Sequence, residues 1–123
     1  MEPKYITFEQ AKWLKEKGFD VPVKSMYHDE EFIYGGADYN HNNKEEQKLW
    51  NCLKLSAPEQ WQVVEWLELT YQKYAYAFRY NGIWQYKIDA EHGTDYFSTG
   101  EGFKSKQEAY SAAFDYIKNN NLI

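Results

Sequence analysis

Three histidines and the acids near them are the first residues whose chemistry could matter. His28 stands in the run His-Asp-Glu-Glu, and His41 and His92 lie in other polar stretches. Imidazole nitrogens and carboxylate oxygens can ligate a transition metal. However, the histidines show no i, i+4 or paired-ligand spacing, and specific ligation needs converging ligands. We therefore expect these side chains to be solvated and predict no metal site.

The single cysteine and the glutamates give no support for catalysis. Cys52 lies in the segment WNCLKL, whose apolar residues favour a partly buried structural thiol over a nucleophile. Glu59 is a candidate helix cap, while Glu65 and Glu68 fall on the polar face of a predicted helix. The sequence also contains no G-x-S-x-G, H-E-x-x-H or Walker motif. We predict no cofactor and no enzymatic activity.

The main candidate for a binding surface lies in the segment YAYAFRYNGIWQYKID. Its residues alternate with a period of two around Asn81-Gly82, which suits a two-residue type I′ turn because both positions need positive φ. We predict a hairpin of Tyr74–Tyr80 with Ile83–Asp89, in which Tyr80 opposes Ile83. One face is then suited to packing against a helix and carries Ala75, Ala77, Arg79, Trp84, Tyr86 and Ile88. The other face, which we call the aromatic face, carries Tyr74, Tyr76, Phe78, Tyr80, Ile83, Gln85, Lys87 and Asp89.

The aromatic face has two interpretations. Tyrosine offers a large contact area and is enriched in protein interfaces, which favours an exposed binding surface. The alternative is that a second helix covers the row, since sheets are usually packed in layers. Trp61 and Leu69 fall on the polar side of a predicted helix and are candidates for a further contact patch. The predicted binding residues are Tyr74, Tyr76, Phe78, Tyr80 and Lys87.

Charge and composition restrict the partners. The 123 residues carry a formal net charge of −5, and 20% of them are aromatic. Residues 1–70 hold 8 lysines and 13 acids, whereas residues 71–123 hold 6 basic and 6 acidic residues, so the acidic excess lies in the first part. Nucleic-acid affinity comes largely from Lys and Arg, so we expect a protein partner and not a nucleic acid. With no apolar run of membrane-spanning length and no signal-peptide pattern, we expect no membrane association and a cytoplasmic monomer or weak dimer.

Two helices are predicted from capping boxes in the first 71 residues. Thr7 begins a T-x-x-Q box for a helix over about residues 8–17. Ser56 and Glu59 predict a second box and a helix over about residues 57–71, with Pro58 in its first turn. One broad arc of that second helix is apolar and consists of Val63, Val64, Trp66, Leu67 and Tyr71.

The remaining segments complete a single α+β domain over residues 1–123. Two β-prone runs at 23–27 and 32–34 predict a hairpin, and a polar loop follows at about 36–48. The segment TDYFSTGEGF, residues 94–103, predicts a third strand beside the Asn81-Gly82 hairpin. The expected order is α-β-β-α-β-β-β-α, with the second and third helices packed on an antiparallel sheet.

The last helix is predicted from the stretch FKSKQEAYSAAFDYI. Ser105 and Glu108 form an S-x-x-E capping box, and small alanines let the helix axis approach a sheet closely. The side of this helix expected to face the sheet carries Ala109, Tyr110, Ala113, Phe114, Tyr116 and Ile117.

Three segments resemble a family of small uncharacterised proteins of Bacteroides-type gut bacteria and their phages. They are ITFEQAKWLKEKGFD, APEQWQVVEWL and QEAYSAAFDYI, at Ile6–Asp20, Ala57–Leu67 and Gln107–Ile117. This resemblance covers most of the chain apart from the loop of residues 28–50. It implies an origin in a phage or mobile element, and it implies no activity, ligand or catalytic residue.

The C-terminal part also resembles the three-strand-plus-helix DNA-binding modules of plant AP2-type and phage integrase proteins. Those modules share an aromatic-x-Thr/Ser-x-x-Glu-Ala phrase, which is matched here by Phe103, Ser105, Glu108 and Ala109. Their strands are rich in Arg and Lys, whereas the predicted hairpin offers Arg79 and Lys87. We therefore predict a non-enzymatic accessory domain that binds another protein through an aromatic surface, with nucleic-acid binding by the C-terminal sheet and helix as the alternative.

Overall fold

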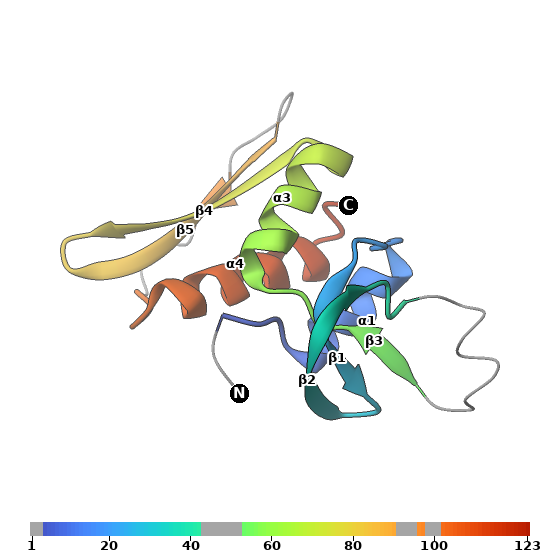
Figure 1. Cartoon of the computed structure of the whole chain (residues 1–123). Helices are drawn as coiled ribbons and strands as arrows, with labels where there is room; N and C mark the ends of the chain where they lie inside the picture. Colours follow the sequence, from blue (N-terminus) through green and yellow to red (C-terminus); the bar gives the residue numbers. More distant parts are fainter. Residues whose placement is uncertain (1–3, 43–52, 91–95, 98–101) are drawn as a thin grey trace. The chain divides into compact units, whose positions relative to one another are not determined.

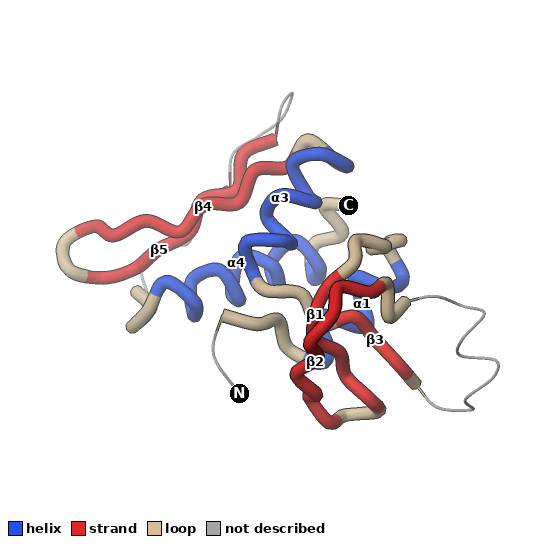
Figure 2. The backbone as a smooth tube through the Cα atoms, viewed as in Figure 1, coloured by secondary structure: helices blue, strands red, loops and turns tan. Residues whose placement is uncertain are grey.

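The computed structural model describes residues 4–42, 53–90, 96–97 and 102–123 of an α+β chain (Figure 1). Helices alternate with two small antiparallel sheets, coloured blue and red in Figure 2. Contacts between Cα atoms divide the chain into two compact units, Met1–Glu59 and Gln60–Ile123. Each unit is described by itself.

The first unit begins with helix α1, Phe8–Glu16, and its predicted capping box is confirmed. The Thr7 hydroxyl accepts a hydrogen bond from the Gln10 N–H at 3.1 Å, and the Gln10 side-chain oxygen accepts one from the Thr7 N–H at 3.0 Å. These bonds satisfy two donors that a helix N-terminus otherwise leaves unpaired. After the helix ends, Gly18 adopts a φ of 87°, which glycine tolerates because it has no Cβ.

The sheet of this unit has the order β2-β1-β3, with β1 at Val23–His28, β2 at Glu31–Tyr39 and β3 at Lys54–Ser56. The predicted hairpin is confirmed, and its turn contains Asp29 with a φ of 51°.

The predicted polar loop starts too early, because β2 continues through Tyr39. The pairing register between β1 and β2 shifts between Val23 and Ser25, because β2 has extra residues there. This irregularity lets Tyr39, at the end of β2, pair with Val23. Gly35 lies directly against the Lys24 carbonyl, where any Cβ would clash with the backbone. The later part of the predicted loop, residues 43–48, lies outside the described residues.

The capping box predicted at Ser56 is wrong, because Ser56 belongs to strand β3. Its hydroxyl accepts from the His41 N–H at 3.0 Å instead of capping a helix. Pro58 also disfavours a helical conformation at the residue before it, Ala57. The Pro58 carbonyl accepts a hydrogen bond from the Ile6 N–H at 3.3 Å. Helix α3 consequently begins three residues later than predicted and spans Gln60–Tyr71.

A buried amide side chain ties together three parts of the first unit. The Asn42 Nδ2 donates to the Phe19 carbonyl at 2.8 Å, and its Oδ1 accepts from the Ser56 N–H at 2.9 Å. Both bonds are buried, so Asn42 satisfies two backbone groups that have left solvent. The buried apolar residues of the first unit are Tyr5, Ile6, Ala11, Trp13, Leu14, Phe19, Val23, Tyr27, Leu55 and Ala57.

The second unit contains a sheet of order β4-β5-β6, with β4 at Lys73–Tyr80, β5 at Ile83–Ala90 and β6 at Tyr96–Phe97. The predicted hairpin register is confirmed from end to end, including the pair of Tyr80 with Ile83. Asn81 and Gly82 have φ values of 51° and 81°, as a type I′ turn requires.

Helix α4, Lys106–Asn119, packs against β4 and β5, and α3 contacts both β4 and α4. Figure 1 shows both helices on the same side of the hairpin. The Ser105 hydroxyl accepts from the Glu108 N–H at 3.1 Å, which confirms this half of the predicted box. The Glu108 carboxylate accepts from the Lys104 N–H at 3.0 Å instead of the Ser105 N–H, so the reciprocal half differs from the prediction. The fully buried apolar residues of α4 are Ala109, Ala113, Phe114 and Ile117.

Candidate functional site

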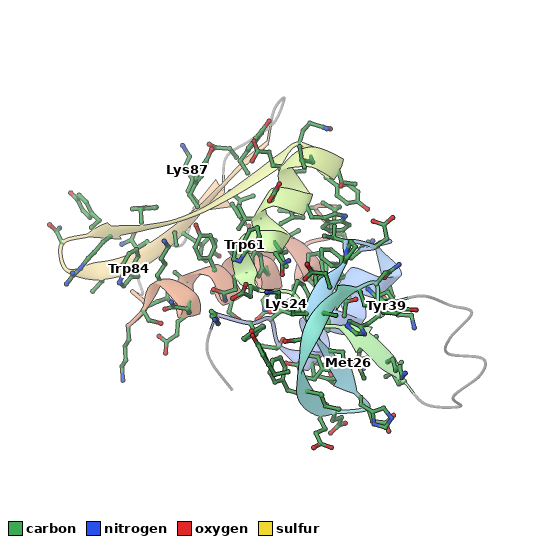
Figure 3. All side chains as sticks on the ribbon, in the orientation of Figure 1. Lys24, Met26, Tyr39, Trp61, Trp84 and Lys87 are labelled. Carbon is green, nitrogen blue, oxygen red and sulfur yellow. The ribbon has the colours of Figure 1, made fainter. Side chains whose placement is uncertain are left out.

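The two faces of the β4–β5 hairpin have different environments. Ala75, Tyr86 and Ile88 are buried on the face that α4 covers, as the alternation of the two strands predicts. The aromatic face points the other way. In Figure 3 the labelled side chains of Lys87 and Trp84 lie on opposite sides of the hairpin.

The aromatic face is exposed at two of its five predicted binding residues, Tyr76 and Tyr80, and at the neighbouring Ile83. Tyr76 keeps 46% of its surface accessible, Tyr80 keeps 62% and Ile83 keeps 39%. Tyr74 and Phe78 are half-buried on the same face. The alternative interpretation, in which a second helix covers the row, does not describe these rings.

The charged groups of the aromatic face lie at one end of it. Lys87 opposes Tyr76 across the strands, and its Nζ lies 3.2 Å from Oδ1 of Asp89, two residues further along β5. Residues two apart on a strand share a face, so this ion pair belongs to the aromatic face itself. Because the Lys87 charge is compensated, the face offers large rings and polar groups with little net charge.

A glycine lets the segment after β6 approach this face. Phe103 bridges to Trp84 on the far side of β5, with N–H···O=C bonds of 3.1 and 2.8 Å. A Cβ placed on the preceding Gly102 would lie 2.5 Å from the Ile83 Cβ and 2.6 Å from its Cδ1. Because Gly102 has no Cβ, the Ile83 side chain has room at this end of the aromatic face.

The face of the hairpin that packs on α4 has the character of a core. The Tyr86 ring lies 6.1 Å from the ring of Phe103 and 6.1 Å from that of Tyr116. Burial raises the pKa of the Tyr86 hydroxyl above 10, and the neighbouring Tyr116 raises it further. Tyr86 is thus neutral at physiological pH and contributes packing.

The histidines and glutamates considered for chemistry are dispersed. His28 is half-buried on β1, and the His41 ring lies 5.3 Å from the Tyr39 ring, while His92 and Cys52 lie outside the described residues. Within residues 4–42, 53–90, 96–97 and 102–123, no three His, Cys, Asp or Glu side chains are close enough to hold a metal ion.

The glutamates do not converge either. Glu59 lies 3.1 Å from the Lys4 ammonium, and Glu65 and Glu68 are exposed on α3. The two apolar residues noted on the polar side of α3, Trp61 and Leu69, are both exposed.

Three exposed apolar residues on strand β2 were not identified from the sequence. They are Ile33, Tyr34 and Tyr39. The sequence indicated only that Phe32–Tyr34 was β-prone, because the full length of β2 depends on its pairing with β1. None of the helices that the structure describes is long and apolar enough to cross a membrane.

Comparison with known proteins finds no similarity that would add to this geometry. No protein-family model matches the chain, and neither a curated protein nor a solved structure matches it.

Proposed function

We propose that this chain binds another protein through the aromatic face of the β4–β5 hairpin, and that its role is recognition without catalysis. The observation that carries the proposal is the joint exposure of Tyr76, Tyr80 and Ile83 on the hairpin face opposite α4. The largest exposed apolar patch of a monomeric protein, typically about 300–600 Å², is often a functional surface.

The charges of the face favour a protein partner over nucleic acid. Binding to a phosphate backbone needs lysines or arginines that can replace counterions. The aromatic face contributes Lys87, whose ammonium is already paired with Asp89 at 3.2 Å. A surface of tyrosines with little net charge, beside Gln85, Lys87 and Asp89 on the neighbouring strand, combines the aromatic and polar groups found in protein interfaces.

The exposed fractions of Tyr76 and Tyr80 limit how much each ring can contribute to the free energy of binding. Taking about 200 Å² for a complete tyrosine side chain, the fractions of 46% and 62% leave about 90 and 125 Å² for a partner to cover. Burial at about 25 cal/mol/Å² would contribute at most about 2 and 3 kcal/mol. Because about 1.4 kcal/mol corresponds to a factor of ten in affinity, loss of either ring is expected to weaken binding about tenfold or more for a partner that covers at least about two thirds of its exposed area.

A displayed library of random twelve-residue peptides, selected on the immobilised full chain, tests the proposal. Peptides that bind the wild-type protein should bind Tyr76→Ala and Tyr80→Ala at least tenfold more weakly. The matched control is Tyr34→Ala, which removes an equally exposed tyrosine from β2 and should leave binding unchanged. Equal affinity for all four proteins would refute the role of the aromatic face.

A further inference from the structure

Helix α3 carries an exposed surface that is separate from the aromatic face. Successive residues of a helix are 100° apart, so four exposed side chains of α3 fall within about 100° of its circumference. They are Trp61, Glu65, Glu68 and Leu69, which we call the α3 stripe. The buried residues Val63, Trp66 and Leu67 lie on the opposite side of the helix. Since α3 and α4 both lie on the side of the hairpin away from the aromatic face, the α3 stripe is a second surface.

Two large apolar side chains mark the ends of the α3 stripe. Trp61 keeps 59% of its surface accessible and Leu69 keeps 71%. With a rise of 1.5 Å per residue, they are about 12 Å apart along the helix axis. At 59% of about 250 Å², Trp61 alone offers a partner about 150 Å². Covering about 60 Å² of apolar surface already corresponds to a tenfold change in affinity.

The two acids between these ends have no compensating charge on their own helix. α3 contains no lysine or arginine, and neither Glu65 nor Glu68 forms an ion pair with another described residue. Like charges three positions apart on a helix repel each other. Glu68 also lies in the last turn, where the negative end of the helix dipole disfavours an acid. Both placements lower the stability of the free helix, and a cationic partner would relieve both.

We propose that the α3 stripe binds a basic amphipathic helix of a partner protein. Two apolar side chains of this helix, about two turns apart, contact Trp61 and Leu69. Two or more lysines or arginines between them face Glu65 and Glu68, which fixes the register of the two helices. Apolar anchors at helical spacing are the usual means by which an amphipathic helix is recognised. Two helices can match over this length because both repeat every 3.6 residues.

The charge of the α3 stripe favours this occupant over three others. Nucleic acids and anionic lipid surfaces attract cations, whereas the stripe offers two acids and no cation. A second copy of this chain that packed stripe against stripe would bring four acids into one interface. Juxtaposed like charges disfavour such an association. A cationic helix is the occupant whose charge complements the stripe.

A displayed library of eighteen-residue helices, selected on the immobilised full chain, provides the first test. The peptides have an alanine-rich helical background, and the residues of one helix face are randomised. Peptides that bind should be enriched in Lys and Arg, with apolar residues on both sides of the cations. Failure to obtain a binder, or binders without cations, would overturn the proposal.

Substitutions on the α3 stripe provide the second test, with the strongest binder made as a synthetic peptide. Glu68→Lys and Trp61→Ala should each weaken its binding at least tenfold. The matched controls are Glu30→Lys, the same change of charge in the turn between β1 and β2, and Tyr34→Ala, which removes an exposed ring from β2. Both controls should bind within twofold of wild type. Equal affinities of Glu68→Lys and Glu30→Lys would overturn the proposal.

The thermal stability of the free chain separates a binding role of Glu68 from a structural one. Glu68→Lys removes the repulsion from Glu65 and places a cation at the negative end of the helix dipole. We therefore expect its unfolding midpoint to rise by about 2–6 °C while its binding weakens. A midpoint below that of wild type would show that Glu68 supports the fold, which overturns its assigned role in binding.

The same peptide distinguishes the α3 stripe from the aromatic face, which carries the proposed function. If Tyr76→Ala weakens binding while Glu68→Lys does not, the peptide binds the aromatic face and the inference about α3 is wrong. If Glu68→Lys weakens binding while Tyr76→Ala does not, the α3 stripe is a binding site whether or not the proposed function stands. A free chain that sediments as a dimer, and as a monomer after Glu68→Lys, would show a second copy on the stripe, which overturns the basic partner.

Discussion

The buried amide of Asn42 should be one of the main local determinants of stability in the first unit. Asn42→Ala would leave the Phe19 carbonyl and the Ser56 N–H without their bonds of 2.8 and 2.9 Å. Each of the two buried groups left unsatisfied costs about 1–3 kcal/mol, so we expect a loss of about 2–6 kcal/mol in the free energy of unfolding. That is a large share of the ~5–15 kcal/mol typical of a domain.

Urea denaturation followed by tryptophan fluorescence measures this loss, because the buried Trp13 belongs to the same unit. At an m-value of about 1–3 kcal/mol/M, a loss of ~3 kcal/mol lowers the unfolding midpoint by about 1–3 M. The control is Asn40→Ala, which removes one acceptor from the neighbouring Asn42 N–H and should cost less than half as much. A loss below about 1 kcal/mol for Asn42→Ala would refute the assigned role of the buried bonds.

Replacing Asn42 by an aspartate, which can carry a charge, provides a second test of the two buried hydrogen bonds. Asn42→Asp keeps an acceptor for the Ser56 N–H but, when ionised, offers no donor to the Phe19 carbonyl. Burial and the need to donate both raise the folded-state pKa of such a carboxyl above its unfolded value of about 3.9. Stability is then fully present below the unfolded pKa and is lost as pH rises through the folded pKa. The variant should therefore lose less stability near pH 4 than near pH 7, relative to wild type at each pH.

Two further predictions concern a close contact and a buried hydroxyl. Gly102→Ala should lower unfolding stability by about 1–3 kcal/mol, because its Cβ meets the Ile83 Cβ at 2.5 Å. In thermal denaturation this added cost should vanish in an Ile83→Gly background, and a cost that persists there would contradict the contact. The Tyr27 hydroxyl donates to the Ile6 carbonyl at 2.7 Å, and burial raises its pKa above 10. The stabilisation from this hydroxyl is complete below about pH 10 and is lost as pH rises through the folded-state pKa. Tyr27→Phe should therefore lower the free energy of unfolding by about 1 kcal/mol at pH 7. The variant should also lose less stability than wild type as the pH is raised above about 10. Equal alkaline declines in urea titrations would contradict this.

Local sequence patterns determined the elements that depend only on neighbouring residues. The Thr7 box, the Ser105 cap and the Asn81-Gly82 turn are each decided within a few residues, because caps and type I′ turns need particular side chains or positive φ. The Asn81-Gly82 turn also sets the hairpin register, since a two-residue connection leaves one alignment. That register by itself separates the aromatic face from the packed face.

Tertiary pairing decided the features that local patterns predicted wrongly or left open. Ser56 had the local pattern of a helix cap, but its pairing with Met26 and its bonds to the 41–42 segment make it a strand residue. Strand β2 extends past the predicted loop start because β1 supplies partners for it. Such long-range bonds outweigh local propensity, which contributes only tenths of a kcal/mol per residue.

The exposure of the candidate site was likewise decided by tertiary structure. Alternation along the strands defined two faces and marked the alanine-containing one as suited to a helix, but it could not say whether a second helix would also cover the aromatic face, because that face carries enough apolar surface to be buried. α4 presents the small residues Ala109 and Ala113 and packs on β4 and β5, where Ala75 allows close approach. Tyr76 and Tyr80 remain exposed on the opposite face, because α4 packs on the other side of the hairpin.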